Sequence, residues 1–353
     1  MARSNWSLVL AGLLATAGLN LVACSSGGTG AGASSVRDAL GQVQDGLIAR
    51  SYLAWADQKA VRTLTGVASP GDIGNKKKVN PRWGRLANVA VPGAAEVEPQ
   101  LTEATGINPY TATRALTIGV APDTAGRLDG ADPATVEKKF KALGAQTDVS
   151  GGRTRLVLAP DDQVVTGNPK LAGDVYLTLN RVVIKGSTVA FGLANGPVDA
   201  ILGGSRALGD AEDESAMATC LGDVVAAEIM APPAGSAPGV TLVGVGVRRP
   251  KTSAEGVREV LCEVANKDRI AQVAAAIAPR LQQNAQIPNT GRQIQDRLTQ
   301  TNVDQLPKGR AVRLTVDLVP TARAGFLFFD QGPGRAGLAF LGGGSPPPPN
   351  SRP

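Results

Sequence analysis

Acidic side chains gather at two places where carboxylate chemistry is conceivable. The segment 210–214 holds four carboxylates in five residues (DAEDE), and Asp161-Asp162 directly follows Pro160. Calcium binds to oxygen-rich loops, but the spacing and the glycine of an EF-hand loop are missing from the first cluster. The proline before the second cluster favours a turn over a catalytic dyad. We therefore interpret both as turns, the first of them solvated, and assign no metal site to either.

Histidine is absent from all 353 residues. Its absence excludes Ser-His-Asp and Cys-His catalysis, an imidazole general base, and zinc or haem sites with histidine ligands. Hydrolases that use paired carboxylates or a Ser-Lys pair remain open. The composition therefore weighs against an enzyme, and we assign no catalytic residue, no metal and no cofactor.

A glycine pattern near the end of the chain has the spacing of a nucleotide-binding loop but lacks the helix that must follow it. The segment 332–337 (GPGRAG) has the GxGxxG spacing and follows the apolar run Phe326–Phe329. A nucleotide site needs a helix directly after the loop, with its amino end facing the pyrophosphate. Here glycine and proline continue to the chain end, which predicts a disordered tail over 332–353.

The first 24 residues have the layout of an export signal. Arg3 provides a positive charge, and Trp6–Ala23 is almost wholly apolar and free of charge. Leu21-Val22-Ala23-Cys24 resembles the lipobox of bacterial lipoproteins. The resemblance implies cleavage between Ala23 and Cys24, with diacylglycerol on the Cys24 thiol holding the protein on the outer face of the cell membrane. The alternatives are a plain signal peptide and an uncleaved membrane helix, because a run of this length just spans a bilayer.

The segment after this cysteine is a tether. Residues 25–35 contain serine, glycine, alanine and threonine alone (SSGGTGAGASS), which is typical of a flexible linker. Two or three acyl chains hold a protein stably on a membrane, and a linker lets a folded part clear the head groups. We therefore expect 1–23 to be a signal peptide and 24–35 to be the lipidated cysteine with its tether.

The chain contains two further cysteines, Cys220 and Cys262. Two thiols in an oxidising compartment are expected to pair. Assigning Cys24 to lipid leaves an even number, so the sequence predicts a Cys220–Cys262 disulfide. The alternative is two separate buried thiols.

Positive charge is mild and scattered, with a net charge of +6. Nucleic-acid binding requires a concentrated basic face, so we do not expect it. The densest basic cluster lies in a predicted loop and comprises Lys76, Lys77, Lys78, Arg82 and Arg85, with Trp83 among them. A solvated loop is the simpler interpretation. The functional one is contact with anionic lipid or wall polymer, which an anchored protein would meet.

One pattern recurs where strands are followed by helices. An apolar run ends in Ala and then Asp or Asn, and an aliphatic residue follows three or four places later. Aspartate and asparagine accept hydrogen bonds from the free amides of a first helical turn, which predicts capped helix starts. The four joints, which suggest a repeated strand–helix unit, are Ala56-Asp57, Ala131-Asp132, Ala194-Asn195 and Ala265-Asn266.

The patterns predict an α+β fold with mixed or antiparallel sheet and packed helices. Expected helices are Asp57–Leu64, Asp132–Leu143, Pro197–Leu202 and Asn266–Gln283. Expected strands are Arg153–Ala159, Arg181–Leu193 with a turn at 185–187, Asp223–Met230, Val240–Val247, Val257–Val264, Ala311–Val319 and Ala324–Phe329. A boundary near 203–215 predicts two similar subdomains, 36–205 and 216–331.

Two further segments carry a resemblance. Ser51–Asp57 (SYLAWAD) and Cys220–Val225 (CLGDVV) resemble segments shared by exported lipoproteins of actinobacteria. The resemblance implies an envelope location and a fold, and it transfers no catalytic residue. We expect a non-enzymatic binding or accessory module, with the membrane and a cell-wall polymer or envelope protein as partners. A carbohydrate-active or wall-active hydrolase with paired carboxylates and a small-molecule-binding protein are the alternatives.

Overall fold

The computed structural model describes residues 35–69, 72, 77–90, 98–161, 163, 179–232, 236–282, 294–306 and 310–325. Met1–Ala33 and Ser34–Pro353 form separate units, and every described residue lies in the second. The predicted signal peptide 1–23, Cys24, Lys76 and the predicted tail 332–353 lie outside the described residues. Within the described part, no helix combines the length and the apolar character needed to cross a membrane.

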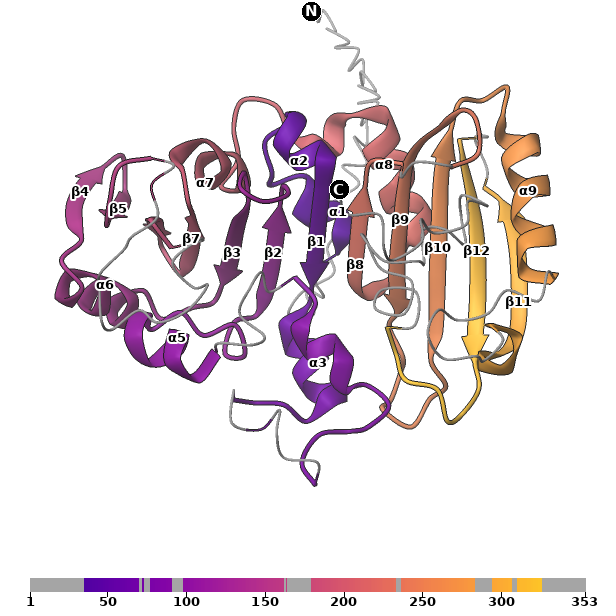
Figure 1. Cartoon of the computed structure of the whole chain (residues 1–353), viewed down its shortest axis with the longest axis horizontal. Coiled ribbons are helices and arrows are strands. Elements are labelled where there is room, and N and C mark those ends of the chain that lie inside the picture. Colours follow the sequence, from indigo (N-terminus) through magenta and orange to yellow (C-terminus); the bar gives the residue numbers. More distant parts are fainter. Residues whose placement is uncertain are drawn as a thin grey trace, which may run out of the picture. The chain divides into compact units, whose positions relative to one another are not determined.

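In the described part of the chain, twelve strands form one antiparallel sheet, which confirms the α+β class (Figure 1). Its order is β11-β12-β10-β9-β8-β1-β2-β3-β7-β6-β5-β4. The first seven strands are β1 (Tyr52–Ala56), β2 (Arg114–Ile118), β3 (Ala125–Asp129), β4 (Gln146–Ser150), β5 (Arg153–Val157), β6 (Arg181–Lys185) and β7 (Thr188–Gly192). The other five are β8 (Val224–Met230), β9 (Val240–Arg248), β10 (Arg258–Ala265), β11 (Leu298–Gln305) and β12 (Ala311–Leu318).

The two halves of the chain supply the two ends of this sheet and meet where β1 pairs with β8. In each half, three strands pair in chain order, β1-β2-β3 or β8-β9-β10, and a helix follows the third strand, α6 (Pro133–Ala142) or α9 (Ile270–Gln282). In each, the last strand then returns to pair with the third, β7 with β3 and β12 with β10. This shared order is the arrangement that an internal duplication produces.

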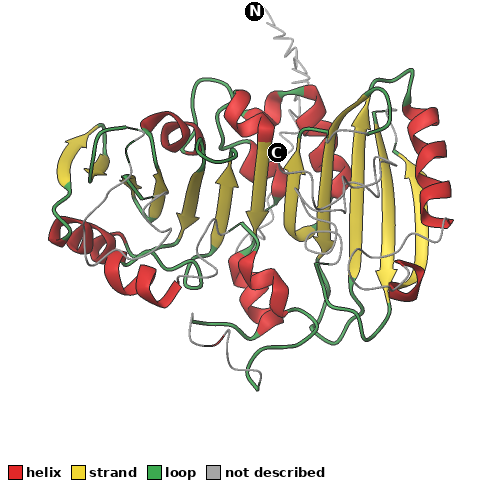
Figure 2. Ribbon diagram, viewed as in Figure 1, coloured by secondary structure: helices red, strands yellow, loops and turns green. Residues whose placement is uncertain are grey.

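Helices cover both faces of the sheet (Figure 2). On one face, here called the α9 face, apolar side chains of α3 (Gln58–Thr65), α6 and α9 join a single core with alternate strand residues. The opposite face is here called the α8 face. It has its own core under four helices, α1 (Val36–Leu40), α2 (Leu47–Ser51), α7 (Asn195–Ile201) and α8 (Glu212–Leu221). Successive strand residues point to opposite faces, so each buried strand contributes to both cores. A further helix of the described part, α5 (Glu98–Thr105), packs beside α6.

Two of the four predicted joints cap their helices as expected. Asp57 accepts a hydrogen bond from the Ala60 amide at 3.0 Å, and Asp132 accepts one from the Thr135 amide at 3.2 Å. The other two predictions are wrong in detail. Ala194 is the N-cap of α7, because the side chain of Asn195 bonds to Asp161 instead. The fourth helix, α9, begins four residues later than expected, at Ile270.

The acidic cluster is the largest departure from the sequence interpretation. It was expected to be a solvated turn, but Glu212, Asp213 and Glu214 form the first turn of α8. Carboxylates are favourable there because the amino end of a helix carries a partial positive charge. Glu214 is also buried, with 4% of its surface exposed, and burial raises its pKa. The strand expected at Ala324–Phe329 is absent at 324–325, and its remaining residues lie outside the described part.

Candidate functional site

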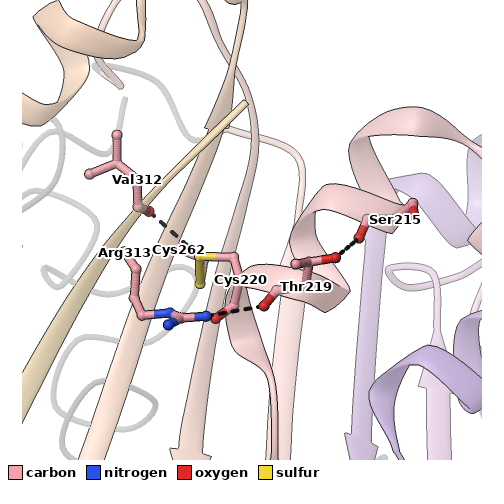
Figure 3. Close-up of a disulfide and its surroundings, with 6 residues drawn as sticks. All are labelled: Ser215, Thr219, Cys220, Cys262, Val312 and Arg313. Carbon is pink, nitrogen blue, oxygen red and sulfur yellow. Dashed lines mark hydrogen bonds between the residues drawn. A yellow bond between two sulfur atoms is a disulfide. The ribbon is translucent and has the colours of Figure 1, made fainter. Parts of the chain in front are cut away.

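The predicted disulfide is present and fixes α8 to the sheet (Figure 3). Cys220 lies in the last turn of α8 and Cys262 lies in the middle of β10, with their Cα atoms 6.0 Å apart. Both residues are fully buried. The bond does not link two strands. It joins a helix to a strand, because the segment before β8 is helical up to Leu221.

Arg313 of β12 binds the carboxyl end of the same helix (Figure 3). Its Nε donates to the carbonyl of Cys220 at 2.7 Å, and its Nη2 donates to the carbonyl of Thr219 at 3.1 Å. The last carbonyls of a helix have no partner within the helix, and a cation is favourable beside them. Burial lowers the pKa of Arg313. Arg313 therefore completes the end of α8, and the helix stops beside β10 and β12.

Beyond the end of α8, a cavity of about 530 Å³ opens on the α8 face of β9, β10, β12 and β11. The first residue of β10, Arg258, shares this face with Cys262, since the two are four residues apart on one strand. The lining is polar or charged except at two positions: it consists of Asp223, Arg248, Arg249, Pro250, Glu255, Gly256, Arg258, Gln300, Asn302, Thr315 and Asp317. We call this cavity the arginine pocket.

Two of the three arginines that line the arginine pocket are held in ion pairs. Arg258 donates to both oxygens of Asp317, at 2.6 and 2.9 Å, across the β10–β12 ladder. This partner raises the pKa of Arg258, first through the hydrogen bond and then through its charge. Arg249 lies 2.9 Å from Asp223 and 3.1 Å from Asp57. Their charges are therefore balanced within the fold.

The third arginine, Arg248, is different. It is half-buried, and its guanidinium makes no hydrogen bond or ion pair with any residue across the described ranges. Burial lowers its pKa, and the positive charges of Arg313 and Arg258 lower it further, while Asp223 opposes them. A half-desolvated cation without a partner is unfavourable for folding. The contacts of the fold therefore give no reason for a positively charged side chain at Arg248.

Gly222 makes room for this guanidinium. It connects α8 to β8 with a φ of 63°, and a Cβ atom there would lie 2.6 Å from Nη1 of Arg248. A left-handed φ already favours glycine, and the close approach of Arg248 gives a second reason for it. The segment Cys220–Val225, which carries the resemblance to actinobacterial lipoproteins, thus supplies the disulfide, Gly222 and the pocket residue Asp223.

Buried carboxyl groups occur on the opposite face of the sheet. Glu228 of β8 accepts a hydrogen bond from the hydroxyl of Tyr52, and burial raises its pKa to about 7. Burial, followed by the charge of Glu228, also raises the pKa of Tyr52. Glu259 and Glu263 of β10 are buried on this α9 face too, and Glu259 accepts a bond from the Gly325 amide at 2.7 Å. These carboxyls face away from the arginine pocket.

Some residues of the predicted basic cluster are held within the fold, and others lie at its surface. Trp83 is fully buried, and its indole N–H donates to the Ser253 carbonyl at 2.9 Å. The guanidinium of Arg82 donates to the carbonyls of Ala254, Glu255 and Pro320 at 3.0–3.3 Å. The ring of Trp83 is packed inside the fold, and the hydrogen bonds of Arg82 hold two loops together. The burial of Trp83 weighs against its part in the predicted envelope contact, which nothing in the structure tests.

The remaining basic residues stay compatible with a surface role. Lys77 and Lys78 are exposed, and Lys78 lies 3.1 Å from Asp72. Arg85 is half-buried in the short helix η1 (Gly84–Asn88). The envelope contact therefore stays a prediction for Lys77, Lys78 and Arg85.

Sequence reasoning missed the arginine pocket. Its residues come from four strands and two loops, and the pairing of β11 with β12 and of β12 with β10 brings them together. The one local signal was the Gly222-Asp223 pair in the segment singled out by resemblance. Among the described residues, no group of three or more carboxylates or cysteines has a metal-binding arrangement.

Comparison with known proteins assigns no relationship. No protein-family model matches the chain, and neither the curated proteins nor the solved structures compared with it give a match.

Proposed function

We propose that this protein is a membrane-anchored extracytoplasmic lipoprotein whose folded part is a non-enzymatic binding module at the cell envelope. The sequence Leu21-Val22-Ala23-Cys24 supports the anchor, as does the serine- and glycine-rich segment after it. The Cys220–Cys262 disulfide supports an oxidising compartment, because such bonds persist outside the reducing cytosol.

The arginine pocket is the observation that carries the binding role. Its volume of about 530 Å³ lies in the range of small-molecule sites, and guanidinium, amide and hydroxyl groups line it. Such groups recognise polar ligands through directed hydrogen bonds. The unpaired Arg248 is available to a ligand without breaking any contact of the fold.

A hydrolase with paired carboxylates finds less support in the same pocket. Such an enzyme needs one carboxyl as acid and one as base or nucleophile, both facing the substrate. Here Asp317 accepts two hydrogen bonds from Arg258, and Asp223 is paired with Arg249. The third acid, Glu255, accepts a bond from the amide of Lys251 at 2.6 Å. All three carboxylates are engaged in holding the pocket together.

The anchor is tested by metabolic labelling with a palmitate analogue in cells that express the full chain. We expect label on the wild type and on a Cys220→Ala/Cys262→Ala variant, and none on Cys24→Ala. Label that persists on Cys24→Ala overturns the anchor.

The non-enzymatic role is tested with isolated cell-wall polymer and the purified full chain in detergent micelles. We expect the protein to sediment with the polymer and the polymer to stay intact. Release of soluble fragments above the level of a buffer control overturns the non-enzymatic role and favours the hydrolase.

A further inference from the structure

The arginine pocket has one charge that the fold leaves without a partner. Arg258 is matched by Asp317, and Arg249 is matched by Asp223 and Asp57. Arg313 donates to two carbonyls at the end of α8. Arg248 lies among these groups, lines the cavity, and has no partner in the described part of the chain. The missing partner is one that enters from the cavity.

We propose that the arginine pocket binds the carboxylate group of a small polar ligand, with Arg248 as its principal partner. This proposal rests on the proposed binding function and names the ligand class. A guanidinium presents two parallel N–H donors that match the two oxygens of a carboxylate. Because Gly222 has no side chain, the guanidinium lies against the backbone at the end of α8 and faces the cavity.

The charges around the pocket favour a carboxylate over a phosphate dianion. Three acidic residues, Asp223, Glu255 and Asp317, line the same cavity as Arg248. A ligand with two negative charges would face all three of them, and like charges at short range repel strongly in a partly desolvated site. One unpaired guanidinium balances one negative charge. The pocket is therefore matched to a monoanion.

The rest of the lining specifies a polar ligand. Asn302 of β11 is paired with Thr315 of β12, and Gln300 is paired with Asp317, so their side chains form a row beside Arg258. Amide and hydroxyl groups both donate and accept hydrogen bonds. A carboxylate attached to hydroxyl or amide groups satisfies this row, as sugar acids and the carboxyl ends of peptides do.

A functional role for Arg248 makes a prediction that a structural role does not. Its guanidinium is partly desolvated, unpaired and close to the charges of Arg313 and Arg258. Replacing it by a neutral side chain removes this repulsion and breaks no hydrogen bond. Residues retained for binding are commonly not the most stable choice at their positions. The Arg248→Gln variant is therefore expected to unfold at the same temperature as the wild type or a higher one, while losing the ligand.

The experiment is titration calorimetry of the full chain in detergent micelles with two probes, D-glucuronate and N-acetyl-D-alanine. We expect at least one probe to bind, and we expect Arg248→Gln to weaken that binding at least about tenfold. Arg248→Lys keeps the charge but loses the two-pronged geometry, so it should recover only part of the affinity. The better of the two probes identifies a sugar acid or a peptide terminus as the source of the carboxylate.

Lys251→Gln is the matched control, because it removes one positive charge from the exposed turn after Pro250 without altering the lining. We expect it to change the affinity less than about twofold, since solvent and salt screen an exposed charge. An equal loss in Lys251→Gln and Arg248→Gln overturns the proposal. So does unchanged binding in Arg248→Gln, or the failure of both probes to bind the wild type. In that last case, sedimentation with wall polymer would show that the broader binding function still stands.

Discussion

Asp57 joins the start of a helix in one half of the chain to Arg249, the residue that follows strand β9 in the other half. Its Oδ1 accepts the Ala60 amide at 3.0 Å and so caps α3, while its Oδ2 lies 3.1 Å from Nη2 of Arg249 at the end of β9. Asp57 is buried, and the exposed fraction of its side chain is 11%. A single carboxylate thus serves a local and a long-range contact.

Changing Asp57 should separate these two contacts. Asp57→Asn keeps a cap but loses the charge, and we expect it to lower the free energy of unfolding by about 1 kcal/mol. Asp57→Ala also loses the cap, and about 2–3 kcal/mol is expected. Denaturant unfolding measures both. Asp223→Asn is the control: its side chain is 71% exposed, so a change below about 0.5 kcal/mol is expected. Equal effects of all three variants would contradict a dual role for Asp57.

Glu228 should make the stability of the protein depend on pH. Its pKa rises from 4.5 to about 7 on folding, because burial disfavours the charged carboxylate. A raised pKa means that the folded state binds a proton more tightly than the unfolded state does. The resulting stabilisation is complete below pH 4.5 and is lost as the pH rises through about 7. A shift of this size corresponds to about 3 kcal/mol.

The Glu228→Gln variant tests this dependence. An amide resembles the protonated carboxyl, so we expect little change in unfolding free energy at pH 4.5 and a gain of about 3 kcal/mol at pH 8. Glu214, whose pKa is also raised by burial, keeps a weaker dependence of the same sign in the variant. Glu137→Gln, at a surface pair with Lys141, is the control and should leave the wild-type pH profile in place. A profile that is identical in wild type and Glu228→Gln would refute the assignment.

The Cys220–Cys262 bond should stabilise the fold chiefly by restricting the unfolded chain. It closes a loop with a sequence separation of 42 residues, for which the chain-entropy relation gives roughly 4 kcal/mol. The Cys220→Ala/Cys262→Ala variant is expected to lose about this amount in denaturant unfolding. Reduction of the wild type should give a similar loss without changing the packing atoms. A loss below about 1 kcal/mol in both measurements would show that the disulfide contributes little to the free energy of unfolding.

The sequence predicted best those elements whose signals are local. The turn at Lys185-Gly186-Ser187 lies between β6 and β7 as expected. The helix expected at Asn266–Gln283 is present as α9, with Ile270, Val273 and Ile277 on its buried side. Short polar strands were missed. In β4 all five residues are exposed, so no alternation of apolar and polar residues marks it.

The acidic segment shows why local composition misled. The cluster at 210–214 is polar enough for a loop, yet Arg310 pairs with Glu212 at 2.9 Å and also contacts Asp213, holding the start of α8 from nearly a hundred residues away. Tertiary contacts of this kind are invisible in a local pattern. The same limit applies to Arg248. That its guanidinium lacks a partner can be seen only when the four strands of the pocket are paired in the folded protein.

A final prediction concerns the basic cluster, whose exposed and buried residues should differ in their effect on vesicle binding. Lys77→Gln/Lys78→Gln removes two exposed charges and should weaken binding to phosphatidylglycerol vesicles, measured on the full chain with its lipid-acceptor Cys24 changed to Ala. Polybasic contacts contribute about 1 kcal/mol per residue near an anionic surface. Unaltered vesicle binding in the double variant would remove the envelope contact.

Trp83→Phe is the contrasting variant. It loses the indole hydrogen bond to the Ser253 carbonyl and leaves a buried acceptor without its donor, so the free energy of unfolding should fall by about 1–3 kcal/mol. Vesicle binding should be unchanged, because the ring is fully buried. Loss of vesicle binding in a folded Trp83→Phe protein would mean that the loop opens at a membrane, and that the packed position of Trp83 is only one of its two states.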